Sequence, residues 1–451
     1  MESGMLKLRV SIIQAKRSVV VILITILLSD CGVNTSVPVS TLGITPTFPS
    51  VLPAATMPLP APPLTSTPTS ALPISSAPDG LRMAYSIDGN LYFQDGSKSP
   101  IQLTDSGKDW QPLFFSENGE SIFFFRGIIP FDLYSINIDG SQEQALVTNS
   151  ILLALGMEYD EATTVCNPTI VPNTQLILFN TCVYPEPNNS YVISGNRDLL
   201  AVDTNTGEIK TLYSPRQAGY FYISPDGKQL AIDKRGQIDI VDINGKIIRS
   251  NLLTYTPSEP ILLLPRIYWT QDSTDLIVIL PVPTFYDTSG GVPQYTVWRY
   301  ALDGSSRVQM PLDPLPKSHN IAQVSPDGNW ILYENDETFS FYLGDLREGS
   351  VQIYEPYPPV IRYEWSRDNK HFIYEFSGDM LLGSVASFAT IISKGDLIGW
   401  VDANRYLYYD YAVRSIVMGE LGRESRLILA NVPKALFPSN PDSFIFTWTS
   451  E

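Results

Sequence analysis

A short turn motif that recurs along the chain constrains the fold more than any other feature of the sequence. Its clearest copy, Ser325-Pro326-Asp327-Gly328, separates two β-prone runs. Pro326 presets φ at the second turn position, and Gly328 permits the positive φ with which a chain re-enters a strand. One such turn would indicate only a loop, but related segments recur through the sequence. They begin at Ala77, Ser116, Val171, Ser224, Thr270, Ser325, Ser366 and Val401.

Each copy precedes a run of β-forming residues, such as residues 122–125, 176–179 or 406–409. A further β-prone run, a second turn and another such run often follow. The copies are about 35 to 55 residues apart, a spacing that suits four strands per repeat. Four-stranded repeats of this kind predict an all-β protein, a β-propeller. We expect eight blades, with seven as the alternative if one weak copy is an insertion.

The first copy has no leading strand of its own, because a Pro-rich segment precedes it. At the other end of the chain, residues 443–448 form a β-prone run that lacks partners nearby in the sequence. An unpaired edge strand is a liability that closed sheets avoid. We therefore predict that this terminal run completes the first blade and closes the ring.

One copy also carries the residues of a known family. Residues 109–119, DWQPLFFSENG, resemble the TolB-like (WD-repeat-like, PD40-type) propeller repeat, D-x-x-P-x-[WF]-S-P-D-G. Residues 102–104 and 146–148 match the Leu-Thr ending of such repeats, and the resemblance covers roughly residues 79–448. It implies a propeller fold and an exported location, with protein or peptide binding as the usual role. TolB carries an α/β domain where this chain has a Pro-rich segment, so TolB's own role is not implied.

The N-terminal residues have the pattern of an export signal. Basic residues precede an apolar run over residues 19–28, which is shorter than the roughly 20 residues that span a bilayer. Residues 28–31, LSDC, resemble the lipobox of bacterial lipoproteins, although Asp30 stands where the family has Gly, Ala or Ser. The resemblance implies lipidation at Cys31. A cleaved signal without a lipid and an uncleaved anchor are the alternatives.

Three regions follow from these patterns. Residues 1–31 are the predicted signal, and residues 79–451 the propeller. Residues 32–78 are rich in Pro, Ser and Thr and predict a disordered, extended tether. Such a tether would hold the propeller away from a membrane. We expect an exported protein at the cell envelope or outer surface, anchored through lipid, with secretion as the alternative.

The net charge of −17 bears on possible partners. An acidic chain without a long basic run argues against binding to nucleic acid or to anionic lipid headgroups. We expect a monomer that binds an unknown protein, peptide or glycan of the envelope.

The sequence offers little catalytic chemistry. The two His residues, His319 and His371, cannot build a multi-His metal site, and no G-x-S-x-G nucleophile motif is present. The Asp-Gly turns lack the full pattern of a calcium loop. We therefore expect no catalytic residue, no metal and no cofactor. The alternative is an envelope hydrolase, directed to glycan or peptide, with a pair of carboxylates in the channel or top face.

Cysteine usage predicts one disulfide. If Cys31 takes the lipid, Cys166 and Cys182 remain in an exported protein. Residues 172–175 form a turn midway between them, so antiparallel pairing would place Cys166 opposite Cys182, within disulfide range. Two free buried thiols are the alternative.

Loop lengths predict the working surface. In a propeller the tight first-to-second turns lie on one face, and the second-to-third loops and blade connections lie on the other. Residues 184–196 and 281–295 are long second-to-third loops, and residues 150–160 and 255–264 are long connections. Binding usually resides in long loops on a rigid scaffold. Their aromatic residues would supply contact area for a peptide or sugar. The candidate contact residues are Tyr184, Tyr191, Phe285, Tyr286 and Tyr295.

Overall fold

The computed structural model describes most of the chain after residue 76. The described residues are 77–127, 130–156, 162–183, 194–257, 264–282, 295–312, 323–335, 340–356, 362–376, 378–429 and 444–448. Their regular secondary structure is β-strand apart from the short helix α2 (Asn149–Ala154), which lies between β7 and β8 in the chain. No helix within these ranges is both long enough and apolar enough to cross a membrane. The all-β prediction is confirmed.

The first sheets contain strands β1 to β16. These are β1 (Leu81–Ile87), β2 (Asn90–Asp95), β3 (Ile101–Gln102), β4 (Asp109–Phe115), β5 (Ser121–Arg126), β6 (Asp132–Asn137), β7 (Gln144–Val147), β8 (Thr163–Ile170), β9 (Leu176–Val183), β10 (Ser194–Gly195), β11 (Leu199–Asp203), β12 (Ile209–Tyr213), β13 (Tyr220–Ile223), β14 (Gln229–Asp233), β15 (Gln237–Asp242) and β16 (Ile247–Thr254).

The remaining sheets contain β17 to β31, and the last strand returns to the first sheet. These are β17 (Arg266–Trp269), β18 (Asp275–Pro281), β19 (Tyr295–Ala301), β20 (Arg307–Gln309), β21 (Gln323–Val324), β22 (Trp330–Asn335), β23 (Ser340–Asp345), β24 (Val351–Pro356), β25 (Arg362–Trp365), β26 (His371–Phe376), β27 (Asp379–Ser384), β28 (Ser387–Trp400), β29 (Arg405–Asp410), β30 (Ser415–Glu420), β31 (Arg426–Leu429) and β32 (Phe444–Trp448).

Most sheets are four-stranded antiparallel meanders in sequence order, as in β13-β14-β15-β16. The β8 sheet has the extra short strand β10, and β25 to β31 form one seven-stranded sheet. In that sheet the 14-residue β28 pairs with β27 along its first part and with β29 along its second. It thus ends one meander of four strands and begins the next. Dividing β28 gives eight blades and leaving it whole gives seven, so the predicted count of eight stays a prediction.

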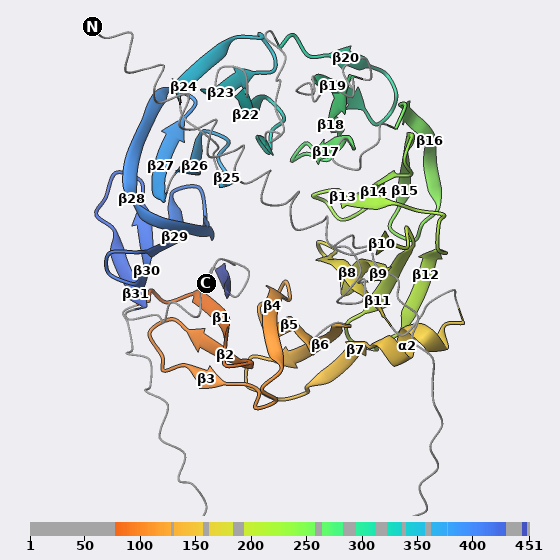
Figure 1. The fold of residues 1–451 in the computed structure, drawn as a ribbon, viewed down its shortest axis with the longest axis vertical. Helices are drawn as coiled ribbons and strands as arrows, with labels where there is room; N and C mark the ends of the chain where they lie inside the picture. Colours follow the sequence, from red (N-terminus) through yellow and green to blue (C-terminus); the bar gives the residue numbers. More distant parts are fainter. Residues whose placement is uncertain are drawn as a thin grey trace, which may run out of the picture. The chain divides into compact units, whose positions relative to one another are not determined.

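The sheets follow one another around a ring (Figure 1). Hydrophobic clusters join these sheets in a closed series. One cluster lies between the β1 and β4 sheets, the next between the β4 and β8 sheets, and so on around the second compact unit, residues 68–451. The series returns to its start, because Leu407 and Tyr409 of β29 pack with Leu81 and Met83 of β1. Each small sheet therefore buries both faces against its neighbours, as a propeller requires.

This burial explains the continuous apolar runs seen in the second strands. In β9, β14, β18 and β22, most residues are buried whichever way their side chains point. A strand covered on both faces needs no polar alternation.

The recurring turns have one internal structure. The hydroxyl of Ser325 accepts a hydrogen bond from Trp330 N at 2.9 Å and donates to Asp327. Gly328 adopts φ +72°, as the sequence predicts. The copies at Ser224, Thr270 and Ser366 repeat the hydroxyl-to-aspartate bond. The Ser or Thr at the first position is therefore part of the turn itself.

The C-terminal strand closes the ring. Strand β32 pairs antiparallel with β1, with Phe446 opposite Met83. It thus supplies the leading strand that the first turn copy lacks, and it contacts β4 of the next sheet. The predicted closure is present in the structure.

Candidate functional site

The face that carries the recurring turns is held together by hydrogen bonds between successive turns. Gln271 N donates to the Pro326 carbonyl at 2.7 Å, and Asp327 N donates to Asn369 Oδ1 at 2.9 Å. Asp226 N donates in the same way to the hydroxyl of Ser273. These backbone N–H groups therefore bond to neighbouring turns. We call this side of the ring the turn face.

The opposite side, the loop face, carries the long connections. Because each sheet is an antiparallel meander, the second-to-third loops and the links between sheets all leave from this side. Two of the long segments fall between β9 and β10 and between β18 and β19. Tyr184, Tyr191, Phe285 and Tyr286 lie in them, outside the described residues. The predicted binding surface on the loop face therefore stays a prediction.

Tyr295 differs from the other candidate contact residues, because the structure buries it. It is the first residue of β19, its side chain is 1% exposed, and it belongs to the cluster between the β17 and β21 sheets. The sequence predicts Tyr295 at the end of a long loop. Strand β19 begins at Tyr295, one residue earlier than predicted. The pleat of the strand turns the tyrosine ring toward the core.

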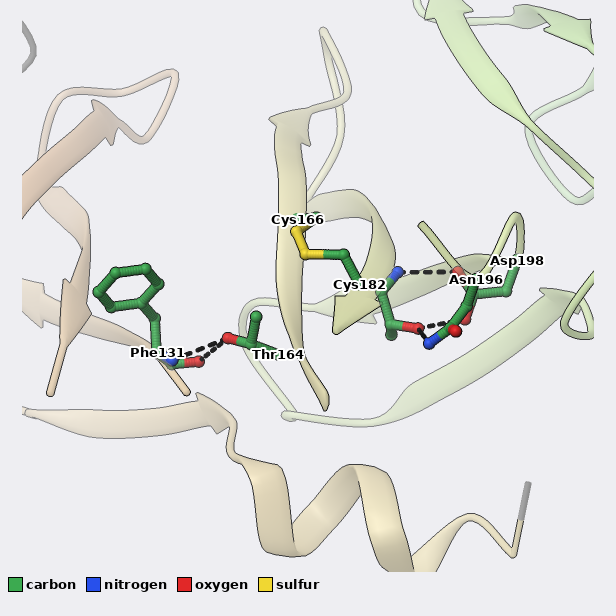
Figure 2. Close-up of a disulfide and its surroundings, with 7 residues drawn as sticks. Phe131, Thr164, Cys166, Cys182, Asn196 and Asp198 are labelled. Atoms are coloured by element: carbon green, nitrogen blue, oxygen red, sulfur yellow. Dashed lines mark hydrogen bonds between the residues drawn. A yellow bond between two sulfur atoms is a disulfide. The ribbon is translucent and has the colours of Figure 1, made fainter. Parts of the chain in front are cut away.

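The predicted disulfide between Cys166 and Cys182 is present, with a Cα–Cα distance of 5.9 Å (Figure 2). The predicted register, however, was wrong. Cys182 lies opposite Thr164, and Cys166 opposite Asn180. The pairing beside the turn, with Ile170 opposite Ile177, differs from the predicted register, and a further shift follows between Cys166 and Thr169. Asn167 has φ +52° at this irregularity, which a turn-based count of residues cannot foresee. The bond therefore joins diagonal neighbours.

The surroundings of the disulfide are tied to the adjoining strands. The Asp198 carboxylate accepts from Thr181 N at 2.8 Å and from the Thr181 hydroxyl at 2.6 Å. Figure 2 shows these bonds beside Cys182, with the Thr164 hydroxyl bonded to the backbone of Phe131 in the preceding sheet. The disulfide thus belongs to a rigid structural region. Cys31, the predicted lipidation site, lies outside the described residues.

Other buried acids near the loop face also have structural partners. Asp109, 1% exposed, pairs with Arg126 at 2.5 Å, and Arg126 also binds Glu143 at 2.6 Å. The Arg126 guanidinium lies 4.3 Å from the ring centre of Tyr134. Burial disfavours the charge on Arg126, but its hydrogen bonds to Glu143 and Asp109 outweigh this and raise its pKa. This group fixes strand ends and offers no free nucleophile.

Asp233 is a buried acid whose set of hydrogen-bond partners among the described residues is incomplete. Its side chain is 1% exposed. One oxygen accepts from the Tyr255 hydroxyl at 2.6 Å and from Arg235 N at 3.0 Å. The other has no hydrogen-bond partner among the described residues. Burial raises the pKa of Asp233, and these hydrogen bonds offset the rise only in part. Sequence reasoning did not single out Asp233, because nothing near it in the sequence distinguishes it from other strand-end acids.

Ser366, Asp368 and His371 lie together without forming a catalytic triad. The aspartate stands between the other two: Ser366 donates to one of its oxygens, and His371 Nδ1 lies 3.0 Å from the other. In a triad the histidine must reach the serine hydroxyl. The same serine-to-aspartate bond occurs at Ser224 and Ser325 without a histidine, so the arrangement belongs to the turn.

Tyrosines gather on the first strands, which face the centre of the ring (Figure 1). Tyr222 of β13, Tyr268 of β17 and Tyr363 of β25 each have a pKa raised by burial, and Arg266 interacts with all three. Within the described ranges, no group of three or more His, Cys, Asp or Glu residues could hold a metal ion. The sequence signal for this cluster was weak, since alternating aromatic residues are ordinary in strands.

Comparisons with known proteins give likenesses of fold only. No family model matches the chain. No curated protein matches it either. One similar solved structure is the β-propeller domain of the Trilobed protease from Pyrococcus furiosus, with 15% identity over 70% of this chain and 95% of that one and a TM-score of 0.41.

Two further solved structures are also similar to this chain. TolB from Acinetobacter baumannii has 15% identity over 64% of this chain and 67% of its own, with a TM-score of 0.31. An oligogalacturonate lyase in complex with manganese has 11% identity over 77% and 84%, with a TM-score of 0.43. TolB, which the repeat resembles in sequence, is thus among the similar structures. The propeller fold itself rests on the strand order and the closed series of clusters.

Proposed function

We propose that this chain is an exported propeller, tethered to the cell envelope or outer surface through Cys31, that binds a protein, peptide or glycan partner without catalysing a reaction. The observation that carries this proposal is the contrast between the two faces. Successive turns bond to one another on the turn face. The long second-to-third segments leave from the loop face, where a rigid ring would present them to a partner.

The buried acids support binding over catalysis. Asp109 and Asp239 pair with Arg126 and Lys234, at 2.5 and 2.9 Å. Asp198 and Glu375 accept backbone N–H groups of neighbouring strands. Carboxylates held in this way maintain strand ends, whereas a glycosidase needs two that face its substrate.

An envelope hydrolase remains the second candidate because of Asp233. A buried acid with a raised pKa and one oxygen without a partner among the described residues has the character of a general acid. Such an enzyme would need a second carboxylate facing the same space. Replacing Asp233 by Asn would then abolish hydrolysis of an envelope glycan or peptide, whereas a binding protein would keep its affinity.

Affinity capture from envelope extracts, with the full chain in mild detergent, tests the proposal. Tyr191→Ala and Tyr286→Ala should each weaken capture of the recovered partner. Lys228→Ala is the matched control, because Lys228 is exposed and follows a tight turn on the turn face. Capture that is unchanged by the tyrosine variants and lost with the Lys228 variant would reject the loop face as the binding surface.

The proposed lipid anchor at Cys31 is tested separately. The Cys31→Ser variant should move from the membrane fraction to the soluble fraction of the envelope, or to the medium. If the variant stays in the membrane fraction, another part of the chain anchors it.

A further inference from the structure

A cavity of about 400 Å³ lies at the turn end of the inward-facing strands β13, β17 and β21, next to the end of β8. Its volume is within the range of small-ligand sites. The residues that line it include the aromatic residues Phe221, Tyr222, Tyr268 and Trp269. The cavity therefore combines residues from four neighbouring sheets, which only the closed ring brings together.

The polar lining of the cavity is uncharged. Among the described residues, its polar side chains are the hydroxyls of Thr169, Tyr222, Tyr268 and Ser325, and no acidic or basic side chain lines it. Hydroxyl groups both donate and accept hydrogen bonds. A charged ligand would lose hydration here and gain no direct ion pair from the lining residues, so the lining favours a neutral ligand.

Most backbone and hydroxyl groups in the wall already have partners. The Tyr222 carbonyl accepts from Trp269 Nε1 at 3.0 Å, and the Pro326 carbonyl from Gln271 N at 2.7 Å. The Ser325 hydroxyl is held by its own turn. A peptide, which binds through backbone groups of a strand edge, would find these carbonyls occupied.

The Tyr222 hydroxyl is different. No hydrogen bond joins it to another described residue, and Tyr222 is one of the residues that line the cavity. Burial raises the pKa of Tyr222, so its hydroxyl stays protonated at neutral pH and can both donate and accept. It is the polar group that a ligand in this cavity could engage at least cost.

We propose that this cavity binds one neutral pyranose ring of a saccharide. A pyranose has an apolar C–H face, which packs against aromatic rings such as those of Tyr222 and Trp269, two lining residues that belong to the same cluster between the β13 and β17 sheets. Its rim of hydroxyls both donates and accepts, which matches the Tyr222 hydroxyl. The site is separate from the proposed partner surface, since the cavity opens at the turn end of the strands and the long segments leave from the loop face.

The test is calorimetric titration of the full chain with cellobiose, maltotriose and chitotriose, and with trigalacturonate as an anionic comparison. We expect at least one neutral saccharide to bind when titrated to about 10 mM, a range suited to weak single-ring sites. Trigalacturonate should bind more weakly. Tyr222→Phe removes only the hydroxyl and should weaken binding by about 3- to 10-fold, the range of one neutral hydrogen bond.

Two further variants test whether the saccharide binds in this cavity. Thr169 is exposed at the rim, so Thr169→Trp should fill the opening without disturbing the core and should abolish binding. Tyr92→Phe is the matched control, because the Tyr92 hydroxyl bonds Gln102 on the outer strands. The proposal is overturned if no neutral saccharide binds, or if binding survives both Tyr222→Phe and Thr169→Trp unchanged. The same variants are also tested for capture of the loop-face partner. Capture that persists when saccharide binding is lost supports the proposed function separately from the saccharide site.

Discussion

The indole Nε1 of Trp269 donates a hydrogen bond to the backbone carbonyl of Tyr222, at 3.0 Å, from the first strand of one sheet to the first strand of the sheet before it. Trp365 repeats this bond to the Gln323 carbonyl at 3.3 Å. Trp400, in turn, bonds to the Glu364 carbonyl at 3.2 Å. Each of the three tryptophans stands directly before a recurring turn, so one position of the repeat joins consecutive repeats.

Replacing Trp365 by Phe should therefore destabilise the fold. Its side chain is 6% exposed, and the Gln323 carbonyl would lose its indole partner. A lost hydrogen bond of this kind costs about 1–3 kcal/mol. Urea unfolding measures the change. Trp298→Phe is the control, because its indole bonds Thr296 within the same strand, and a loss there as large as at Trp365 would contradict the role given to the bond between sheets.

Removing residues 443–451 should destabilise the whole ring. Strand β32 covers the edge of β1, and Phe444, 5% exposed, stacks on Tyr85 with ring centres 6.2 Å apart. Without β32 that edge is unpaired and the closing cluster loses a member. A thermal melt should show a much lower Tm. Removal of residues 449–451 alone should leave Tm near the wild-type value, and an unchanged melt for the longer deletion would disprove closure by β32.

Replacing Cys166 and Cys182 together by Ser should lower the free energy of unfolding by about 3 kcal/mol, since the bond closes a loop of moderate length in the unfolded chain. The two residues are separated by 16 positions. Urea unfolding of oxidised wild type and of the variant gives the difference. Titration of thiols in denatured, non-reduced protein should find neither of them, and reactive thiols at both positions would refute the bond.

Replacing Gly227 by Ala should be more costly than most surface substitutions. Gly227 has φ +71°, and an added Cβ would lie 2.2 Å from the Pro172 carbonyl oxygen of the neighbouring turn. Backbone strain and this clash together should cost about 1–3 kcal/mol. Gly107→Ala is the control, because Gly107 has φ +64° but open space around it. Equal losses of stability at both positions would show that the cost arises from the positive φ alone and not from the clash with Pro172.

The stability of the chain should depend on the protonation of Asp233. Its folded-state pKa is raised by burial, so the folded state binds this proton more tightly than the unfolded state. Ionising Asp233 therefore lowers the stability of the wild-type fold. This loss of stability is absent below the ordinary Asp pKa of about 3.9 and grows as pH rises toward the folded-state pKa. Asp233→Asn should therefore gain stability relative to wild type between about pH 4 and pH 7. Urea unfolding of both proteins at the two pH values tests this. If the variant instead loses stability relative to wild type as pH rises, the folded-state pKa of Asp233 is not raised.

The sequence by itself determined where the strands and tight turns lie. The turn at Ser325 is specified within five residues, by the hydroxyl that Trp330 N reaches and by a glycine that tolerates positive φ. The lack of a strand before Ala77 and the lone run at the chain end likewise indicated closure, now seen as the pairing of β32 with β1. Such signals are local, or depend on a simple count of strands, and so can be read along the chain.

Only the tertiary structure decided how the repeats meet. The shift beside Cys166, the burial of Tyr295 and the cavity next to Tyr222 all depend on neighbouring strands and on residues in adjoining sheets. Packing selects these partners by shape and by unsatisfied hydrogen bonds, which appear only when the sheets are brought together. For that reason the blade pattern could be predicted from residues close in the sequence, whereas the cavity could not.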